Sequence, residues 1–243
     1  MGTSVFALSF VVYRAYSMGR HTAGPSIGDS KGIKGCHRED ETLREGCISF
    51  SLGEMVAPRS KSFLYTRAGD KGTSSLFNLE KRSKGDAAFE ALGSMDELNA
   101  SLGVAVEHCR LAGNGLAGIL REVQSLLIDA SALVATPRSS STERKIARTQ
   151  FPSRCTTQLE ASIDELDARL PQLKTFILPG GGLAASHLHL SRCVCRRAER
   201  SLQPLLADGQ GVEEVARFVN RLSDFLFAAA RYASLVEGNP ERS

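Results

Sequence analysis

The stretch "EEVARFVNRLSDFLFAAARYASLV", residues 213–236, decides the fold. Its apolar residues recur every three or four positions, which is the period of an amphipathic α-helix that buries one face. They are Val215, Phe218, Val219, Leu222, Phe225, Leu226, Ala229, Tyr232 and Val236. We therefore predict a long helix that packs in a core and ends near Gly238.

Two further segments upstream have the same period. One begins at about residue 94, where Ser94 and Glu97 are spaced as a capping box, the arrangement that starts many helices. Another covers about residues 116–133 and is closed by Pro137 and a run of serines. Both segments are expected to be amphipathic helices.

Two more helices are expected nearer the carboxyl end. One begins at Thr157, with Glu160 completing a second capping box, and continues to Pro171. The other follows the glycines at 180–182 and reaches about Leu206. Because no strand alternation appears after residue 90, we predict an all-α fold, a bundle of five helices.

Length and charge limit the organisation and the partners. The chain has 243 residues, enough for one sizeable domain, which we place at 61–243 after a tail and linker at 1–60. A net charge of +3, from 30 basic and 27 acidic residues, is too balanced for the basic face of a nucleic-acid binder. The longest apolar run, residues 5–13, is too short to span a membrane. We therefore expect neither nucleic acid nor a membrane as a partner.

The first 28 residues have the composition of a mitochondrial transit peptide, because they contain Arg14 and Arg20 but no acidic residue. We therefore expect the protein in the mitochondrial matrix, with a disordered tail and a cytoplasmic protein as the alternative. The six cysteines form no C-x-x-C pair, and the five histidines have no metal-ligand spacing. We expect no metal held by protein side chains of these types.

The loop "FLYTRAGDKGTSSLF", residues 63–77, combines glycines, basic residues and hydroxyl groups, which suits phosphate binding. No G-x-x-x-x-G-K-[ST] motif occurs in the chain, so the loop is not a P-loop. Downstream, Arg192, Arg196 and Arg200 form one helical row about 12 Å long, the length of an extended polyphosphate. A solvated charged face, with Glu199 holding one arginine, is the alternative.

Five ordered motifs carry a family resemblance: "YTRAGDKGTSS", "ALGSMDELNASLG", "FILPGGG", "CRRAER" and "NRLSDFLFAAARYA". Over about residues 63–239 the chain resembles the PduO-type ATP:cob(I)alamin adenosyltransferases, most closely the mitochondrial eukaryotic form. The resemblance implies a homotrimer in which ATP and cobalamin bind between subunits. It also implies transfer of the 5′-deoxyadenosyl group of ATP to cob(I)alamin, with adenosylcobalamin and triphosphate as products.

The resemblance also implies residue roles. Arg196, Arg200, Phe176 and Asp224 are the candidate catalytic residues, with Phe176 and Asp224 next to cobalamin. Asp96 is expected to pair with Arg196 across the subunit interface. The ATP contacts implied are Thr66, Arg67, Ala68, Gly69, Ser74, Ser75, Lys84, Arg196, Arg197, Ala198, Glu199, Arg200 and Asn220. Mg²⁺ is expected to share the charge of the triphosphate, and a reductase and an adenosylcobalamin-dependent acceptor enzyme are the expected protein partners.

Three alternatives stay open at this point. Phe176 precedes Pro179 and three glycines, and a side chain there either lies beneath the corrin ring or simply packs the end of a helix. A nucleotide-sensing bundle without activity and an ATP-dependent phosphotransferase would both use the same loop and arginines. A phosphotransferase leaves ADP, whereas adenosyl transfer leaves triphosphate.

Overall fold

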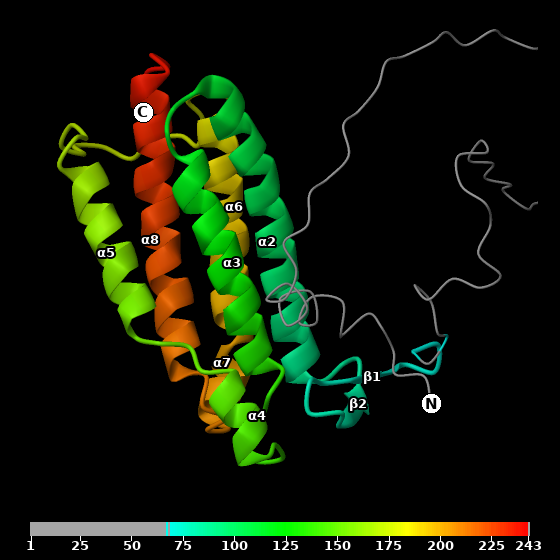
Figure 1. Cartoon of the computed structure of the whole chain (residues 1–243). Helices are drawn as coiled ribbons and strands as arrows, with labels where there is room; N and C mark the ends of the chain where they lie inside the picture. Colours follow the sequence, from blue (N-terminus) through cyan, green and yellow to red (C-terminus); the bar gives the residue numbers. More distant parts are fainter. Residues whose placement is uncertain (1–66, 68, 243) are drawn as a thin grey trace, which may run out of the picture.

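The computed structural model describes residue 67 and residues 69–242 (Figure 1). A short hairpin comes first, formed by β1 (Thr73–Ser75) and β2 (Lys81–Ser83), with Ser74 opposite Arg82. Helices make up most of the remainder. They are α2 (Ala87–Ala112), α3 (Ala117–Val134), α4 (Glu143–Arg148), α5 (Arg154–Asp167), α6 (Leu183–Ser201), α7 (Gln203–Ala207) and α8 (Glu213–Val236). The all-α prediction is confirmed in its coarser form, because the described residues are mostly helical, and the short hairpin is an addition that the prediction did not contain.

The long helices pack side by side around one apolar core (Figure 1). α6 lies between α2 and α8, while α3 packs on α2 and α5 packs on α8. Phe218, Phe225 and Leu188 are among the fully buried side chains of the core. Burial of each such side chain stabilises the fold by about 1.5–3 kcal/mol. Among the described helices, none is both long and apolar enough to cross a membrane.

α2 and α6 run in opposite directions, and their contacts fix which ends lie together. Glu97 forms an ion pair with Arg197 near the hairpin end of the bundle. His108 stacks on His187 farther along, with ring centroids 4.6 Å apart. The start of α6, and the loop before it, therefore lie at the end of the bundle away from the hairpin.

The expected start of the first helix is wrong. α2 begins at Ala87, about two turns before Ser94, because the Asp86 side chain accepts a hydrogen bond from the Ala88 amide at 2.8 Å. Ser94 is buried inside the helix and does not cap it. The S-x-x-E spacing at Ser94 and Glu97 is thus coincidental, and Glu97 serves as the ion-pair partner of Arg197.

The boundaries of other helices also differ from the prediction. α5 begins at Arg154, before Thr157, and Glu160 forms an ion pair with Arg221 and no capping box. α6 ends at Ser201, and α7 starts anew because Pro204 has no amide hydrogen to continue the helix. Two short helices, α4 and α7, were not expected from the periodicity. Six residues are too few to display a period.

Candidate functional site

A cavity of about 440 Å³ opens between the hairpin, α2 and α3. Three residues expected to contact ATP line it, Ser74, Ser75 and Lys84, together with Asp96 from α2. The remaining residues of the wall are mostly apolar, with Asn99 and Ser131 as the polar exceptions. The others are Leu76, Phe77, Phe89, Leu92, Gly93, Met95 and Ala135. An apolar pocket with a few polar groups at defined places is the usual form of a small-molecule site.

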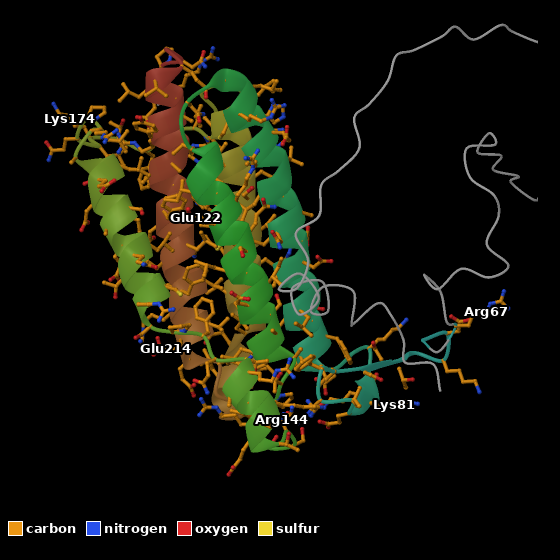
Figure 2. All side chains as sticks on the ribbon, viewed as in Figure 1. Arg67, Lys81, Glu122, Arg144, Lys174 and Glu214 are labelled. Carbon is orange, nitrogen blue, oxygen red and sulfur yellow. The ribbon has the colours of Figure 1, made fainter. Side chains whose placement is uncertain are left out.

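The glycine loop folds back onto Lys84. The Lys84 amide donates to the Gly72 carbonyl at 2.9 Å, and Gly72 has a φ of 74°, a conformation that favours glycine. A Cβ on Gly69 would lie 3.3 Å from Nζ of Lys84. Arg67 is exposed, and Figure 2 shows its side chain at the far end of this segment, away from the bundle. Thr66 and Ala68 lie outside the described residues.

A polar network anchors the hairpin to the bundle. The Glu80 carboxylate accepts hydrogen bonds from Arg82, Asn78 and Ser140, which joins the hairpin to the segment between α3 and α4. Arg82 also forms an ion pair with Asp86, the N-cap of α2. These hydrogen bonds, chiefly that from Arg82, lower the pKa of Glu80 to about 2. The hairpin, and with it Ser74 and Ser75, is therefore fixed relative to α2 and α3.

The predicted arginines lie on α6, outside this cavity. Arg196 and Arg200 are exposed, whereas Arg197 is held by Glu97 of α2. Glu199 accepts a hydrogen bond from Asn220 of α8 at 2.8 Å, so these two expected ATP contacts are brought together. Within the described part of the chain, no ion pair joins Glu199 to an arginine. Ala198, another of the expected ATP contacts on α6, has its side chain fully buried in the core.

Asp224 lies one turn beyond Asn220 on α8 and is exposed. Its carboxylate accepts a hydrogen bond from Arg221 at 3.1 Å, and Arg221 also binds Glu160 of α5. Asp224 is thereby held in place at the surface between α5 and α8. The role of Asp224 next to cobalamin stays a prediction.

Arg192, the first arginine of the predicted row, lies on α6 near two residues that sequence reasoning did not assign, His189 of α6 and Phe227 of α8. The Arg192 guanidinium lies 5.9 Å from the centre of the Phe227 ring, and its Nε is buried without a hydrogen-bond partner. His189 is buried beside the same ring, and this burial lowers the pKa of His189. One feature of the sequence could have drawn attention to Phe227: this aromatic residue falls outside the apolar stripe of its helix.

Phe176 lies in the loop between α5 and α6, and its side chain is 97% exposed. The loop itself is anchored: the Leu178 amide donates to the Arg242 carbonyl at 2.8 Å. Gly181 has a φ of 92°, and a Cβ there would come within 2.4 Å of Oγ of Ser234 on α8. The expected glycine turn therefore exists, and it holds the loop against α8 while Phe176 faces outward. Packing of Phe176 in the core of its own chain is excluded.

The site residues fall into groups that one chain does not bring together. Among the described residues, the cavity is lined by the hairpin, α2 and α3, and by none from α6 or α8. Asp96 lines the cavity, and burial raises its pKa. The Phe176 loop lies at the opposite end of the bundle from the hairpin, as Lys174 and Lys81 show in Figure 2. The expected pairing of Asp96 with Arg196 stays a prediction.

Comparison with known proteins gives the family. Residues 64–233 match the family described as cobalamin adenosyltransferase. The corrinoid adenosyltransferase MMAB of mouse (Mus musculus) is 46% identical over 194 residues, which cover 78% of this chain and 82% of the mouse protein. The human (Homo sapiens) protein of the same name is 44% identical over 194 residues, 78% of each chain. The chain belongs to the cobalamin adenosyltransferase family.

A solved structure supports the same assignment. It is a variant of the PduO-type ATP:corrinoid adenosyltransferase from Lactobacillus reuteri, with one phenylalanine replaced by alanine, complexed with cobalamin and ATP. The TM-score is 0.67 at 36% sequence identity, and the match covers 74% of this chain and 97% of that one.

Proposed function

We propose that this protein transfers the 5′-deoxyadenosyl group of ATP to cob(I)alamin and releases adenosylcobalamin and triphosphate. Membership of the cobalamin adenosyltransferase family carries the proposal, together with a similar solved structure that holds both cobalamin and ATP. The cavity beside Lys84, Ser74 and Ser75 supports it, because it offers both a cation and hydroxyl groups to a nucleotide.

The chemistry assigns the protein a limited set of tasks. The Co(I) centre of the substrate is itself the nucleophile that attacks C5′ of the ribose, so no side-chain nucleophile or general base is required. The protein has to hold the two substrates in line and to stabilise the charge that develops on the leaving triphosphate. We assign the stabilisation of that charge to the ammonium group of Lys84 and to Arg196 and Arg200, whose guanidinium groups pair with phosphate oxygens in a bidentate manner.

We place Mg²⁺ on the triphosphate. The described residues contain no group of three His, Cys, Asp or Glu side chains that would hold a metal ion. Mg²⁺ commonly keeps several waters and binds through substrate phosphates, with few protein ligands. The site therefore fits an ion that arrives with ATP, and the residues Ser74 and Ser75 offer hydroxyl groups near it.

We infer that each complete site forms between copies of the chain, in the homotrimer of five-helix bundles expected for the family. The cavity lies between the hairpin, α2 and α3, whereas the arginines lie on α6, and the loop that follows Lys174 lies at the end of the bundle away from Lys81. A site that holds ATP against the cavity and the arginines, and cobalamin against Phe176, would therefore take residues from a second copy. The face of α2 and α6 also exposes apolar side chains that an interface would cover. These are Val104, Leu111, Leu183 and Leu190.

Mixing two inactive variants tests this assembly. Lys84→Ala removes the hairpin half of a site and Arg196→Ala removes the helix half. If the halves come from different copies, subunits exchanged at equal ratio recover activity in about a quarter of the sites. If both residues serve the same chain's site, each chain has one defect and the mixture stays inactive.

The cell location and protein partners are also proposals. The composition of residues 1–28 supports import into the mitochondrial matrix, and these residues lie outside the described part of the chain. A reductase must supply cob(I)alamin, and an adenosylcobalamin-dependent enzyme would accept the product. A fluorescent fusion to residues 1–60 that stays cytoplasmic would contradict the location.

The spectrum of cobalamin tests the activity itself. Purified protein with ATP, Mg²⁺ and chemically reduced cobalamin should convert the cob(I)alamin spectrum to that of adenosylcobalamin. A nucleotide-sensing bundle would bind ATP without this change. Lys84→Ala provides the matched control, since it should reduce the rate while the helical content is unchanged.

A further inference from the structure

Two histidines stack on each other where α2 meets α6. The ring centroids of His108 and His187 lie 4.6 Å apart, with an angle of 13° between the ring planes. Both side chains are half-buried. Imidazole is the side chain that takes up a proton between pH 5 and pH 8, and two protonated rings so close together repel each other. The stacked pair can therefore change the charge of this surface near neutral pH.

The histidine pair lies at the centre of an exposed apolar patch, which we call the α2–α6 patch. Each histidine has an aliphatic side chain one turn before it and another one turn after it on the same face of its helix. These four side chains are 45% to 72% exposed. They are Val104 and Leu111 on α2, and Leu183 and Leu190 on α6. Exposed apolar side chains that gather in one place mark an interaction surface.

The charges around the pair nearly balance. On α6, residues 183–191 contain no Asp, Glu, Lys or Arg, and the other histidine there, His189, is buried beside Phe227. On α2, Glu107 forms an ion pair with Arg110 at 2.9 Å. The remaining charged groups of the adjoining elements are Arg121 and Glu122 at the start of α3, both exposed, and Glu237 after α8, which accepts a hydrogen bond from Asn114 at 2.8 Å. Protonation of His108 and His187 would therefore make a nearly neutral apolar surface positive.

The position of the α2–α6 patch favours further copies of the chain as its partner. α3, α2, α6 and α8 pack in that order, so the contact of α2 with α6 lies between two sides of the bundle. One side holds the cavity of the hairpin, α2 and α3, and the other is where Glu199 of α6 meets Asn220 of α8. In the homotrimer proposed above, the first side of one copy meets the second side of the next. A subunit of a closed ring contacts its neighbours through two different surfaces, and the surface between these two turns toward the axis.

We propose that the His108–His187 pair makes assembly of the homotrimer depend on pH, so that the trimer forms with both rings neutral and weakens when they take up protons. Three α2–α6 patches that meet at the axis remove the rings from water, and a charge buried there without a partner is costly. The assembled chain then binds fewer protons than the free chain, so association strengthens as the pH rises and is lost as the pH falls. This inference rests on the proposed function, from which it takes the homotrimer.

Sedimentation velocity of the full chain between pH 8 and pH 5.5 tests the proposal. The dissociation constant of the wild-type trimer should rise about tenfold or more per pH unit below about pH 6.5, the effect of excluding one proton or more. A double variant with His108→Leu and His187→Leu should remain trimeric at pH 5.5, because leucine extends the apolar patch and takes up no proton. Glu107→Gln is the matched control, since it removes a titratable group next to His108 and should keep the wild-type dependence on pH.

A fixed charge gives a second measurement. His108→Lys should weaken the trimer at pH 8 about as much as acid weakens the wild type, while circular dichroism shows unchanged helical content. A wild-type trimer whose dissociation constant is the same at pH 8 and pH 5.5 overturns the proposal, and so does a double leucine variant that keeps the wild-type dependence. A monomer that adenosylates cobalamin also overturns it but leaves the activity standing. A trimer that shows the expected dependence on pH but never adenosylates cobalamin supports the role of the histidines and contradicts the proposed activity.

Discussion

Phe176→Ala separates a role in cobalamin chemistry from a role in the fold. The side chain is 97% exposed, so its truncation removes almost no buried surface. The free energy of unfolding should therefore change by less than about 0.5 kcal/mol, as is usual for surface positions. A phenylalanine packed in a core would instead cost about 3–5 kcal/mol.

The effect on cobalamin should be much larger. If the ring lies beneath the corrin, binding removes most of its surface from water, which contributes about 1.5–3 kcal/mol. Loss of that contribution is a factor of about 10–150. The ring would also occupy the place of the lower axial ligand, because Co(I) forms readily only when that ligand is displaced. Turnover of the variant should therefore fall at least tenfold while ATP binding stays near the wild-type value.

Electron paramagnetic resonance of cob(II)alamin bound with ATP is the assay. The wild type should give a four-coordinate signal, and Phe176→Ala should give mainly the five-coordinate species. Leu178→Ala is the matched control, because this exposed residue lies in the same loop and the substitution retains the backbone amide that donates to the Arg242 carbonyl. A four-coordinate signal in Phe176→Ala as strong as in the wild type would refute the reasoning.

Four other predictions follow from the same structure. Arg196→Ala should lose most adenosyl transfer, at a typical 2–5 kcal/mol for an unpaired charge in a complex, and steady-state kinetics with wild-type turnover would contradict this. Deletion of residues 1–60 should leave ATP affinity intact by calorimetry, whereas deletion through Ser75 should abolish it with the helical content retained. Because the folded-state pKa of Glu80 is lowered, its stabilisation is complete above pH 4.5 and disappears as the pH falls toward about 2. Glu80→Gln should therefore flatten the stability profile between these values in acid denaturation, and an unchanged profile would count against the network. Leu190→Asp should weaken the oligomer on the exposed face of α6, measured by light scattering, and a variant as oligomeric as the wild type would exclude that face.

The long helices could be predicted because their apolar period is strong. Val215, Phe218 and Leu222 mark the buried face of α8 in the sequence, and all three are buried in the structure. Helix starts were predicted poorly, because a capping box is a short pattern that also arises by chance. The spacing of Ser94 and Glu97 predicts a cap at Ser94, whereas Asp86, which has no glutamate three residues later, caps the helix.

The site was predictable in its parts and not in its arrangement. The resemblance named Ser74, Ser75 and Lys84, and the structure brings these three to one cavity. Nothing in the sequence indicated that Asn99 lines the same cavity, because its position depends on the packing of α2 against α3, where Asn99 and Gln124 exchange hydrogen bonds. Contacts between distant helices are set by the packing of the whole bundle, so no local pattern reports them.

The separation between the parts of the site agrees with what the resemblance implies, that ATP and cobalamin bind between subunits. No spacing in the sequence shows which residues of one chain lie apart. The structure places the loop on the α3 side of α2 and Arg196 on α6, and it places Phe176 at the far end of the bundle. Assembly of copies, which a single sequence does not display, would supply the missing proximity.

Analysis of the phosphate product tests the central claim most directly. ATP labelled at the γ-phosphate would be incubated with Mg²⁺, cob(I)alamin and the purified protein, and the products separated by chromatography. Adenosyl transfer predicts labelled triphosphate in a one-to-one ratio with adenosylcobalamin and no ADP. Formation of ADP with a labelled acceptor, or ATP bound and recovered unchanged while cob(I)alamin persists, would contradict the account.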